Sequence, residues 1–151
     1  MGNKKAALNL LDEAIKNLPD DPELIYAEVL LLDPYTDRDK LDKTLKQLLQ
    51  LEPNSPTYLN AYAYTLALQN RRLKEARQYA EQALEYAPEQ ASILDTLGYI
   101  AFLQNDYEGA AEALGKAYEL SHNVNIGVRY AKALYMQGSL TQFSAVLQQL
   151  K

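Results

Sequence analysis

The sequence predicts an all-α fold, in which about nine helices pack as antiparallel pairs along one continuous core. Two observations carry this prediction. Apolar residues recur at the spacing of an amphipathic helix and β-branched residues are scarce, which favours helix over strand. Small residues also recur at an offset of 34 residues, since Ala76 and Ala83 reappear as Ala110 and Ala117. A period of this length is typical of helix pairs that stack side by side as a solenoid.

Prolines mark the ends and the beginnings of the predicted helices. Pro19, Pro53 and Pro88 come just after helical patterns, where a fixed φ and a missing N–H stop the helix. Pro22 and Pro56 fall in the first turn of the following helix, where the missing donor costs nothing. The predicted helices span residues 3–18, 22–32, 38–51, 56–69, 72–86, 91–104, 107–120, 125–137 and 140–150.

The helices group into repeats along a single predicted domain over residues 1–151. Residues 3–19 carry only the second half of the pattern, so we expect a half repeat there and a chain that begins within a repeat. Residues 22–54 form a degenerate repeat. Residues 56–90 and 91–123 form the two clearest repeats, and residues 124–151 form a C-terminal one.

The two clearest repeats resemble the tetratricopeptide repeat (TPR). The resemblance is carried by Leu94, Leu97, Gly98 and Ala101 on one predicted helix and by Tyr107, Ala110, Leu114 and Ala117 on the next. Gly98, like Ala63 and Ala131 in the neighbouring repeats, leaves room for the paired helix. The departures are Leu59 and Leu94 at a position that is usually aromatic, and His122 in place of the terminal proline. The resemblance implies a right-handed α-solenoid whose first helices line a concave groove.

Composition argues against several classes of function. The net charge of −5 disfavours general nucleic-acid binding, which needs a basic surface. Cysteine is absent and His122 is the sole histidine, so we expect no metal site, and we expect His122 to cap a helix or lie on the surface. A glycine-rich phosphate loop and a nucleophile elbow are both absent from the sequence. We therefore expect no catalytic residue, no cofactor and no enzyme.

Location is indicated only by a second resemblance. Residues 59–67, 93–99 and 117–121 are similar to the terminal repeats of proteobacterial envelope TPR proteins, some of which are lipoprotein adaptors that present substrates to a carboxy-terminal processing protease. This similarity favours a periplasmic or envelope-associated protein, with the cytoplasm as the alternative. Apolar runs are far shorter than the roughly 18–20 residues that span a bilayer, so we expect no direct membrane insertion.

Candidate binding residues follow from the TPR resemblance, which implies that equivalent positions of successive first helices face the groove. These positions hold Asn60, Tyr64, Asp95, Thr96, Tyr99, Arg129 and Lys132. Tyrosine offers a rigid apolar ring with a polar tip, and the cations suit an acidic group. The alternative is that Asp95 and Arg129 neutralise each other across adjacent repeats.

The favoured function is therefore a non-catalytic interaction module that binds a peptide or protein partner in the groove. Such a module would serve as an adaptor or scaffold of an envelope complex. The alternative function is structural: the chain would pack against the rest of a longer TPR chain or self-associate, and an oligomer is compatible with both.

Overall fold

The computed structural model describes residues 2–151, which form nine α-helices and contain no strand. The helices are α1 (Gly2–Asn17), α2 (Pro22–Leu31), α3 (Arg38–Leu51), α4 (Pro56–Leu68), α5 (Leu73–Tyr86), α6 (Ala91–Leu103), α7 (Tyr107–Ser121), α8 (Val124–Gln137) and α9 (Leu140–Gln149). Every predicted boundary lies within one residue of the observed one. The all-α prediction is confirmed.

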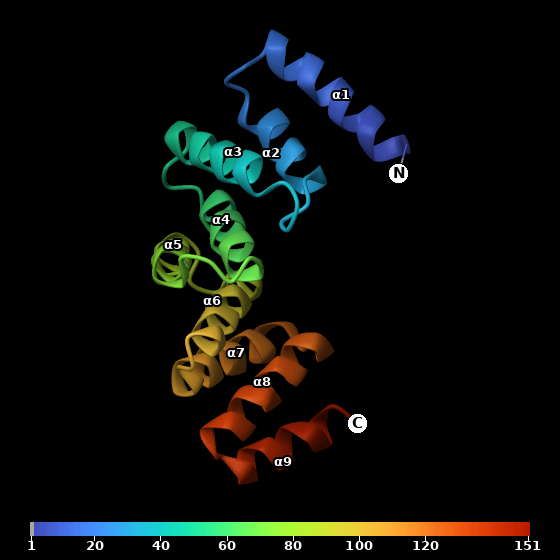
Figure 1. Cartoon of the computed structure of the whole chain (residues 1–151). Helices are drawn as coiled ribbons and strands as arrows, with labels where there is room; N and C mark the ends of the chain where they lie inside the picture. The colour runs from blue at the N-terminus through green and yellow to red at the C-terminus, as the bar shows by residue number, and fades with distance from the viewer. Residues whose placement is uncertain (1) are drawn as a thin grey trace.

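The helices stack in chain order into an arched solenoid (Figure 1). α4 packs against α5, α6 against α7, and α8 against α9, so each of these neighbours in the chain forms a pair. α4 also contacts α6, and α6 contacts α8. The first helices of successive pairs therefore lie next to one another and share one side of the arch.

Small residues let the paired helices approach closely, as the repeat pattern predicted. Ala76 and Ala83 of α5 and Ala110 and Ala117 of α7 are fully buried between helices. At Gly98 of α6, a Cβ atom would lie only 2.4 Å from the Cγ atom of Leu114 on α7. The backbone of α6 thus packs directly onto a leucine side chain, which is possible only without a side chain at this position.

Side chains and left-handed residues close the helix ends. A side-chain oxygen accepts a backbone N–H of the following helix at four N-caps, which are Asp21, Ser55, Asp106 and Asn123. His122 ends α7 with a φ of 52°, and its N–H donates to the Tyr118 carbonyl. The histidine that replaces the terminal proline is therefore a C-cap, one of the two roles that the sequence predicted for it.

A partly buried polar network joins three helices in the N-terminal half of the arch. Tyr62 of α4 is fully buried, and its hydroxyl donates to the Asp42 carboxylate of α3. Arg72, at the start of α5, donates to the Tyr62 hydroxyl at 2.7 Å and to Asp42 at 2.6 Å. The Tyr62 ring stacks on that of Tyr79 with 4.9 Å between centroids. This network ties the degenerate repeat to the regular one.

The Asp42 carboxylate is expected to stabilise the fold above pH 4 and to lose this effect in acid. Partial burial raises the pKa of Asp42, but hydrogen bonds from Tyr62, Lys46 and Arg72 outweigh burial and lower the pKa to about 2. The pKa of the unfolded chain is about 3.9, so the native state prefers the charged form. With allowance for solvent screening, this preference corresponds to about 1–2 kcal/mol at neutral pH.

Urea denaturation of the wild type and of Asp42→Asn at a series of pH values tests the contribution of the Asp42 charge to stability. The difference in unfolding free energy between the two is expected to be largest above about pH 5 and to shrink as the pH falls towards 2. A difference that is equal at pH 7 and pH 2.5 would show that the charge of Asp42 does not contribute.

Candidate partner-binding groove

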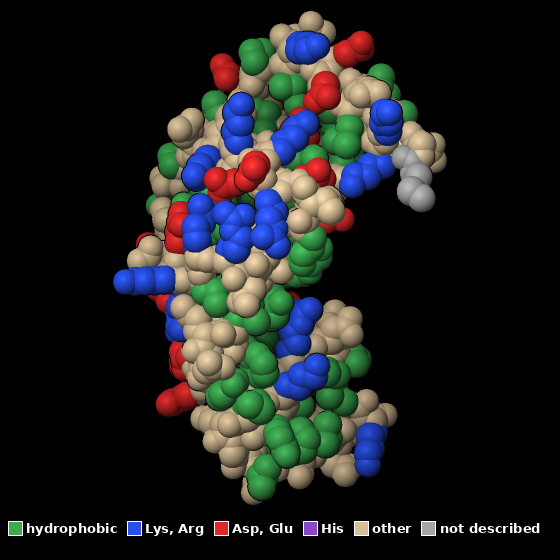
Figure 2. All heavy atoms as spheres, viewed as in Figure 1, with side chains coloured by type: hydrophobic (Ala, Val, Ile, Leu, Met, Phe, Trp, Pro, Cys, Tyr) green, Lys and Arg blue, Asp and Glu red, His purple; other side chains and the backbone are tan. Residues whose placement is uncertain are grey.

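A concave groove of about 640 Å³ runs along the first helices α2, α4 and α6 and reaches α8. It is hollowed into one side of the molecule, between the upper and lower halves of the view in Figure 2. The residues that line the groove include Tyr26, Leu30, Asn60, Tyr64, Asp95, Thr96 and Arg129. This set includes five of the seven residues that the sequence placed on the binding surface.

α4 contributes Asn60 and Tyr64, which lie one turn apart and therefore on the same face of the helix. Asn60 is half-buried, and Tyr64 is 39% exposed. The tyrosine thus presents much of its ring to a partner. The small residue Ala63 beside it is fully buried against the paired helix, which turns Tyr64 to the other side.

α6 places Asp95 in the groove but uses Thr96 differently from the prediction. Thr96 lies at the groove wall but is only 3% exposed, and its hydroxyl donates to the Ser92 carbonyl at 3.0 Å. Its polar group is therefore satisfied within the helix. Because its side chain is almost fully buried, Thr96 offers a partner little surface, and the expectation of a contact there is corrected.

α8 supplies two cations, of which Arg129 is half-buried and Lys132 is exposed. Arg129 forms an ion pair with Asp95 across adjacent repeats. The hydrogen bond with Asp95 raises the pKa of Arg129 and outweighs the opposing effect of burial. The ion pair between Asp95 and Arg129, which the sequence left as an alternative, is thus present. Both residues line the groove.

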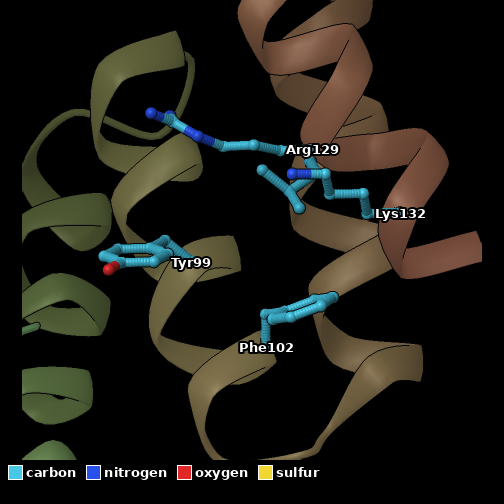
Figure 3. A pocket seen from close by; sticks show the side chains of 5 residues that line it. Tyr99, Phe102, Arg129 and Lys132 are labelled. Carbon is cyan, nitrogen blue, oxygen red and sulfur yellow. The ribbon is translucent and has the colours of Figure 1, made fainter. Parts of the chain in front are cut away.

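A second cavity of about 160 Å³ lies between α6 and α8, next to the groove. We call it the Phe102 cavity; it is lined by Tyr99, Phe102, Leu114, Arg129 and Lys132. Figure 3 shows Arg129 and Lys132 extending from α8 towards the helix that carries Tyr99 and Phe102. The remaining two predicted residues, Tyr99 and Lys132, therefore line this cavity, and Arg129 borders both spaces.

The pKa of Tyr99 reflects its partly buried position beside the Phe102 cavity. Burial raises the pKa of its hydroxyl, and Tyr35 and Tyr64 add to this effect while Arg129 opposes it. Tyr99 is therefore a neutral hydroxyl at physiological pH, able both to donate and to accept a hydrogen bond.

Two buried oxygens in the groove accept no hydrogen bond from residues 2–151. They are Oδ1 of Asn60 and Oδ1 of Asp95, which stand at equivalent positions of α4 and α6, 35 residues apart. An acceptor that is buried without a partner costs roughly 1–3 kcal/mol. Both oxygens lie just beneath the groove surface, so a ligand that brings N–H groups reaches them once the side chains that cover them rotate aside.

Among the groove residues that the sequence analysis missed are Tyr26 and Leu30 of α2. They stand 34 residues before Asn60 and Tyr64, so the repeat period itself contained the signal. The degenerate sequence of residues 22–54 hid it. Phe102 and Leu114 were also missed as lining residues, because their shared cavity depends on how α7 and α8 pack against α6.

Within residues 2–151, no cluster of three or more His, Asp or Glu side chains is arranged to hold a metal ion. Over the same part of the chain, no helix is both long enough and apolar enough to cross a membrane.

Comparison with known proteins agrees with the repeat pattern. No family model matches the chain. It is 30% identical over 116 residues to TPR repeat-containing protein PA4667 of Pseudomonas aeruginosa, a match that covers 77% of this chain and 20% of that protein. The chain therefore spans about one fifth of the length of this curated relative.

Solved structures show the same architecture. The crystal structure of PilW, a widely conserved type IV pilus biogenesis factor, superposes with a TM-score of 0.88 at 17% identity and covers 99% of this chain and 69% of that one. The structure of YrrB, a TPR protein with an unusual peptide-binding site, superposes with a TM-score of 0.74 at 19% identity and covers 93% and 72%. The repeat period, the stacked helix pairs and these similarities together identify the chain as a tetratricopeptide repeat (TPR) protein.

Proposed function

We propose that the chain is a non-catalytic interaction module that binds a segment of a partner protein in its concave groove, as an adaptor or scaffold of an envelope complex. TPR solenoids serve in general as scaffolds for protein–protein interactions. The finer parts of this proposal are supported by the unusual peptide-binding site of YrrB and by the role of PilW as a type IV pilus biogenesis factor.

The observation that carries the proposal is the pair of unsatisfied acceptors in the groove. Oδ1 of Asn60 and Oδ1 of Asp95 are buried at equivalent positions of neighbouring helices and accept no hydrogen bond from the described residues. A peptide backbone supplies N–H donors at regular intervals. A bound segment that displaces the side chains covering these oxygens would donate N–H groups to both. Each such hydrogen bond would also remove the cost of a buried acceptor without a partner.

The surroundings of the two acceptors suit the same kind of ligand. Tyr64 and Tyr26 place aromatic rings along the groove, and Leu30 is 67% exposed there. Rigid aromatic rings contribute contact area at a small cost in side-chain entropy. Because the groove is built on packed helices, binding requires little ordering of the protein, which favours affinity.

The groove is tested by substituting Asn60→Ala together with Tyr64→Ala. Partners are first captured from lysate of the source cells with the wild type and identified by mass spectrometry, and their affinity is then measured by biolayer interferometry. The double substitution is expected to weaken binding about tenfold, as loss of roughly 1.4 kcal/mol predicts. Circular dichroism at 222 nm confirms that the helices are retained.

The matched control is Lys74→Ala with Gln78→Ala on α5, where both side chains are exposed and face away from the first helices. This pair is expected to leave the affinity unchanged, since exposed polar groups contribute little. If the control weakens binding and the groove pair does not, the partner binds the convex side and the groove proposal is wrong.

A second candidate function is favoured by apolar side chains that lie exposed near the C-terminal end. Tyr135, Met136 and Leu140 are 59%, 49% and 58% exposed. Exposed apolar groups in such number at one end suit packing against further repeats or a second chain. In that case the Asn60→Ala and Tyr64→Ala double substitution leaves partner capture unchanged. Sedimentation velocity then shows self-association of the wild type, and the double substitution Tyr135→Ser with Met136→Ser abolishes it.

A further inference from the structure

The C-terminal repeat differs sharply in charge from the rest of the chain. Residues 124–151 contain three cations, Arg129, Lys132 and Lys151, and no Asp or Glu. Residues 1–123 hold all twenty acidic residues and the other twelve Lys and Arg. In the lower part of the view in Figure 2, basic and apolar side chains dominate and acidic ones are confined to one edge. An acidic ligand is therefore attracted to this end of an otherwise acidic molecule.

The Phe102 cavity lies where this basic repeat meets α6. Leu114, which is 1% exposed, forms its floor, and the rings of Tyr99 and Phe102 contribute to its walls. A second hollow lined by Tyr135, Met136 and Phe143 adjoins it, since both spaces share Phe102 and Lys132. The cavity measures about 160 Å³, and a cavity of about 150 Å³ accommodates a benzene molecule. It is large enough for one leucine or phenylalanine side chain.

The two cations at this cavity differ in what they contact. Arg129 is paired with Asp95. For Lys132, no carboxylate within residues 2–151 lies at ion-pair distance from the ammonium group. Lys132 is exposed and borders both the Phe102 cavity and the adjoining hollow. An uncompensated charge thus stands beside an apolar site.

We propose that the Phe102 cavity binds one apolar side chain of a partner peptide while Lys132 binds a carboxylate next to that side chain. The proposal rests on the proposed function and narrows it to partners with an apolar residue beside a negative charge. The carboxylate belongs either to the last residue of the peptide or to an adjacent Asp or Glu. The chemistry at Lys132 is the same in both cases, because an ammonium group pairs with either carboxylate as a point charge.

The test uses three small probes and ¹⁵N-labelled protein. N-acetyl-leucine carries the terminal carboxylate, N-acetyl-leucinamide carries none, and N-acetyl-aspartyl-leucinamide carries a side-chain carboxylate. Titration is expected to shift the backbone amide signals of Tyr99, Phe102 and Lys132, and N-acetyl-leucine is expected to bind about threefold more tightly than its amide, as suits one exposed ion pair. The affinity of the aspartyl probe identifies which source of carboxylate is preferred.

Lys132→Gln removes the charge and retains most of the stem. In this variant N-acetyl-leucine is expected to bind only as tightly as the amide does. The control Lys116→Gln on α7, also exposed and without an ion pair in the described residues, should preserve the difference. Phe102→Ala should weaken all three probes.

Equal affinities for the acid and the amide in the wild type, or an unchanged preference in Lys132→Gln, would overturn the proposal. So would the absence of any shift at Tyr99, Phe102 and Lys132. These results leave the groove function intact if the Asn60 and Tyr64 substitutions still weaken partner capture. If instead those substitutions have no effect while the probes bind as expected, the groove proposal fails and the cavity stands as a separate site.

Discussion

Tyr62→Ala is expected to lower the free energy of unfolding by about 4 kcal/mol. Tyr62 is fully buried, stacks on Tyr79 and joins Asp42 to Arg72. Truncation therefore creates a cavity between α4 and α5 and also removes the hydroxyl from a partly buried polar network. Urea denaturation followed by circular dichroism at 222 nm measures the loss.

Two variants separate the parts of this effect. Tyr62→Phe keeps the ring and removes only the hydroxyl, so it should cost about 1 kcal/mol. Tyr86→Ala truncates a tyrosine that is 48% exposed at the end of α5 and should change stability by no more than about 0.5 kcal/mol. If Tyr62→Ala is no more destabilising than Tyr86→Ala, the junction between the degenerate and the regular repeat does not depend on Tyr62.

Gly98→Leu is expected to destabilise the protein by about 3 kcal/mol. Leucine is the better helix former by up to about 1 kcal/mol, so intrinsic propensity alone predicts a gain. A steric clash with Leu114 outweighs this gain, because a Cβ atom at position 98 would lie 2.4 Å from Cγ and 2.8 Å from Cδ2 of Leu114. α6 and α7 must then move apart, which disturbs the floor of the Phe102 cavity.

A double-mutant cycle with Leu114→Ala identifies the cause. Leu114→Ala alone removes a buried side chain and should cost about 2–5 kcal/mol. In combination with Gly98→Leu, the new side chain fills the space that Leu114 leaves, so the double variant should lose clearly less than the sum of the two. Additive losses would mean that the overpacking occurs elsewhere.

Much of this protein could be predicted from local pattern. The helix boundaries follow from apolar spacing and from prolines, whose effect on the backbone does not depend on distant residues. The position of the groove follows from the repeat, because residues one turn apart on equivalent helices must face the same side once the helices stack. That is why Asn60, Tyr64 and Asp95 were placed in the groove from the TPR resemblance alone.

Other features depended on the tertiary structure. Thr96 shares the helix with Asp95 and Tyr99, yet its side chain is buried and its hydroxyl donates to the Ser92 carbonyl. Distances between helices likewise decide that Arg129 pairs with Asp95, and that Lys132 has no carboxylate at ion-pair distance within residues 2–151. The Phe102 cavity exists only because α6, α7 and α8 meet around Leu114. Repeat periodicity determines which face a residue occupies, whereas crossing angles and side-chain rotamers determine what it contacts there.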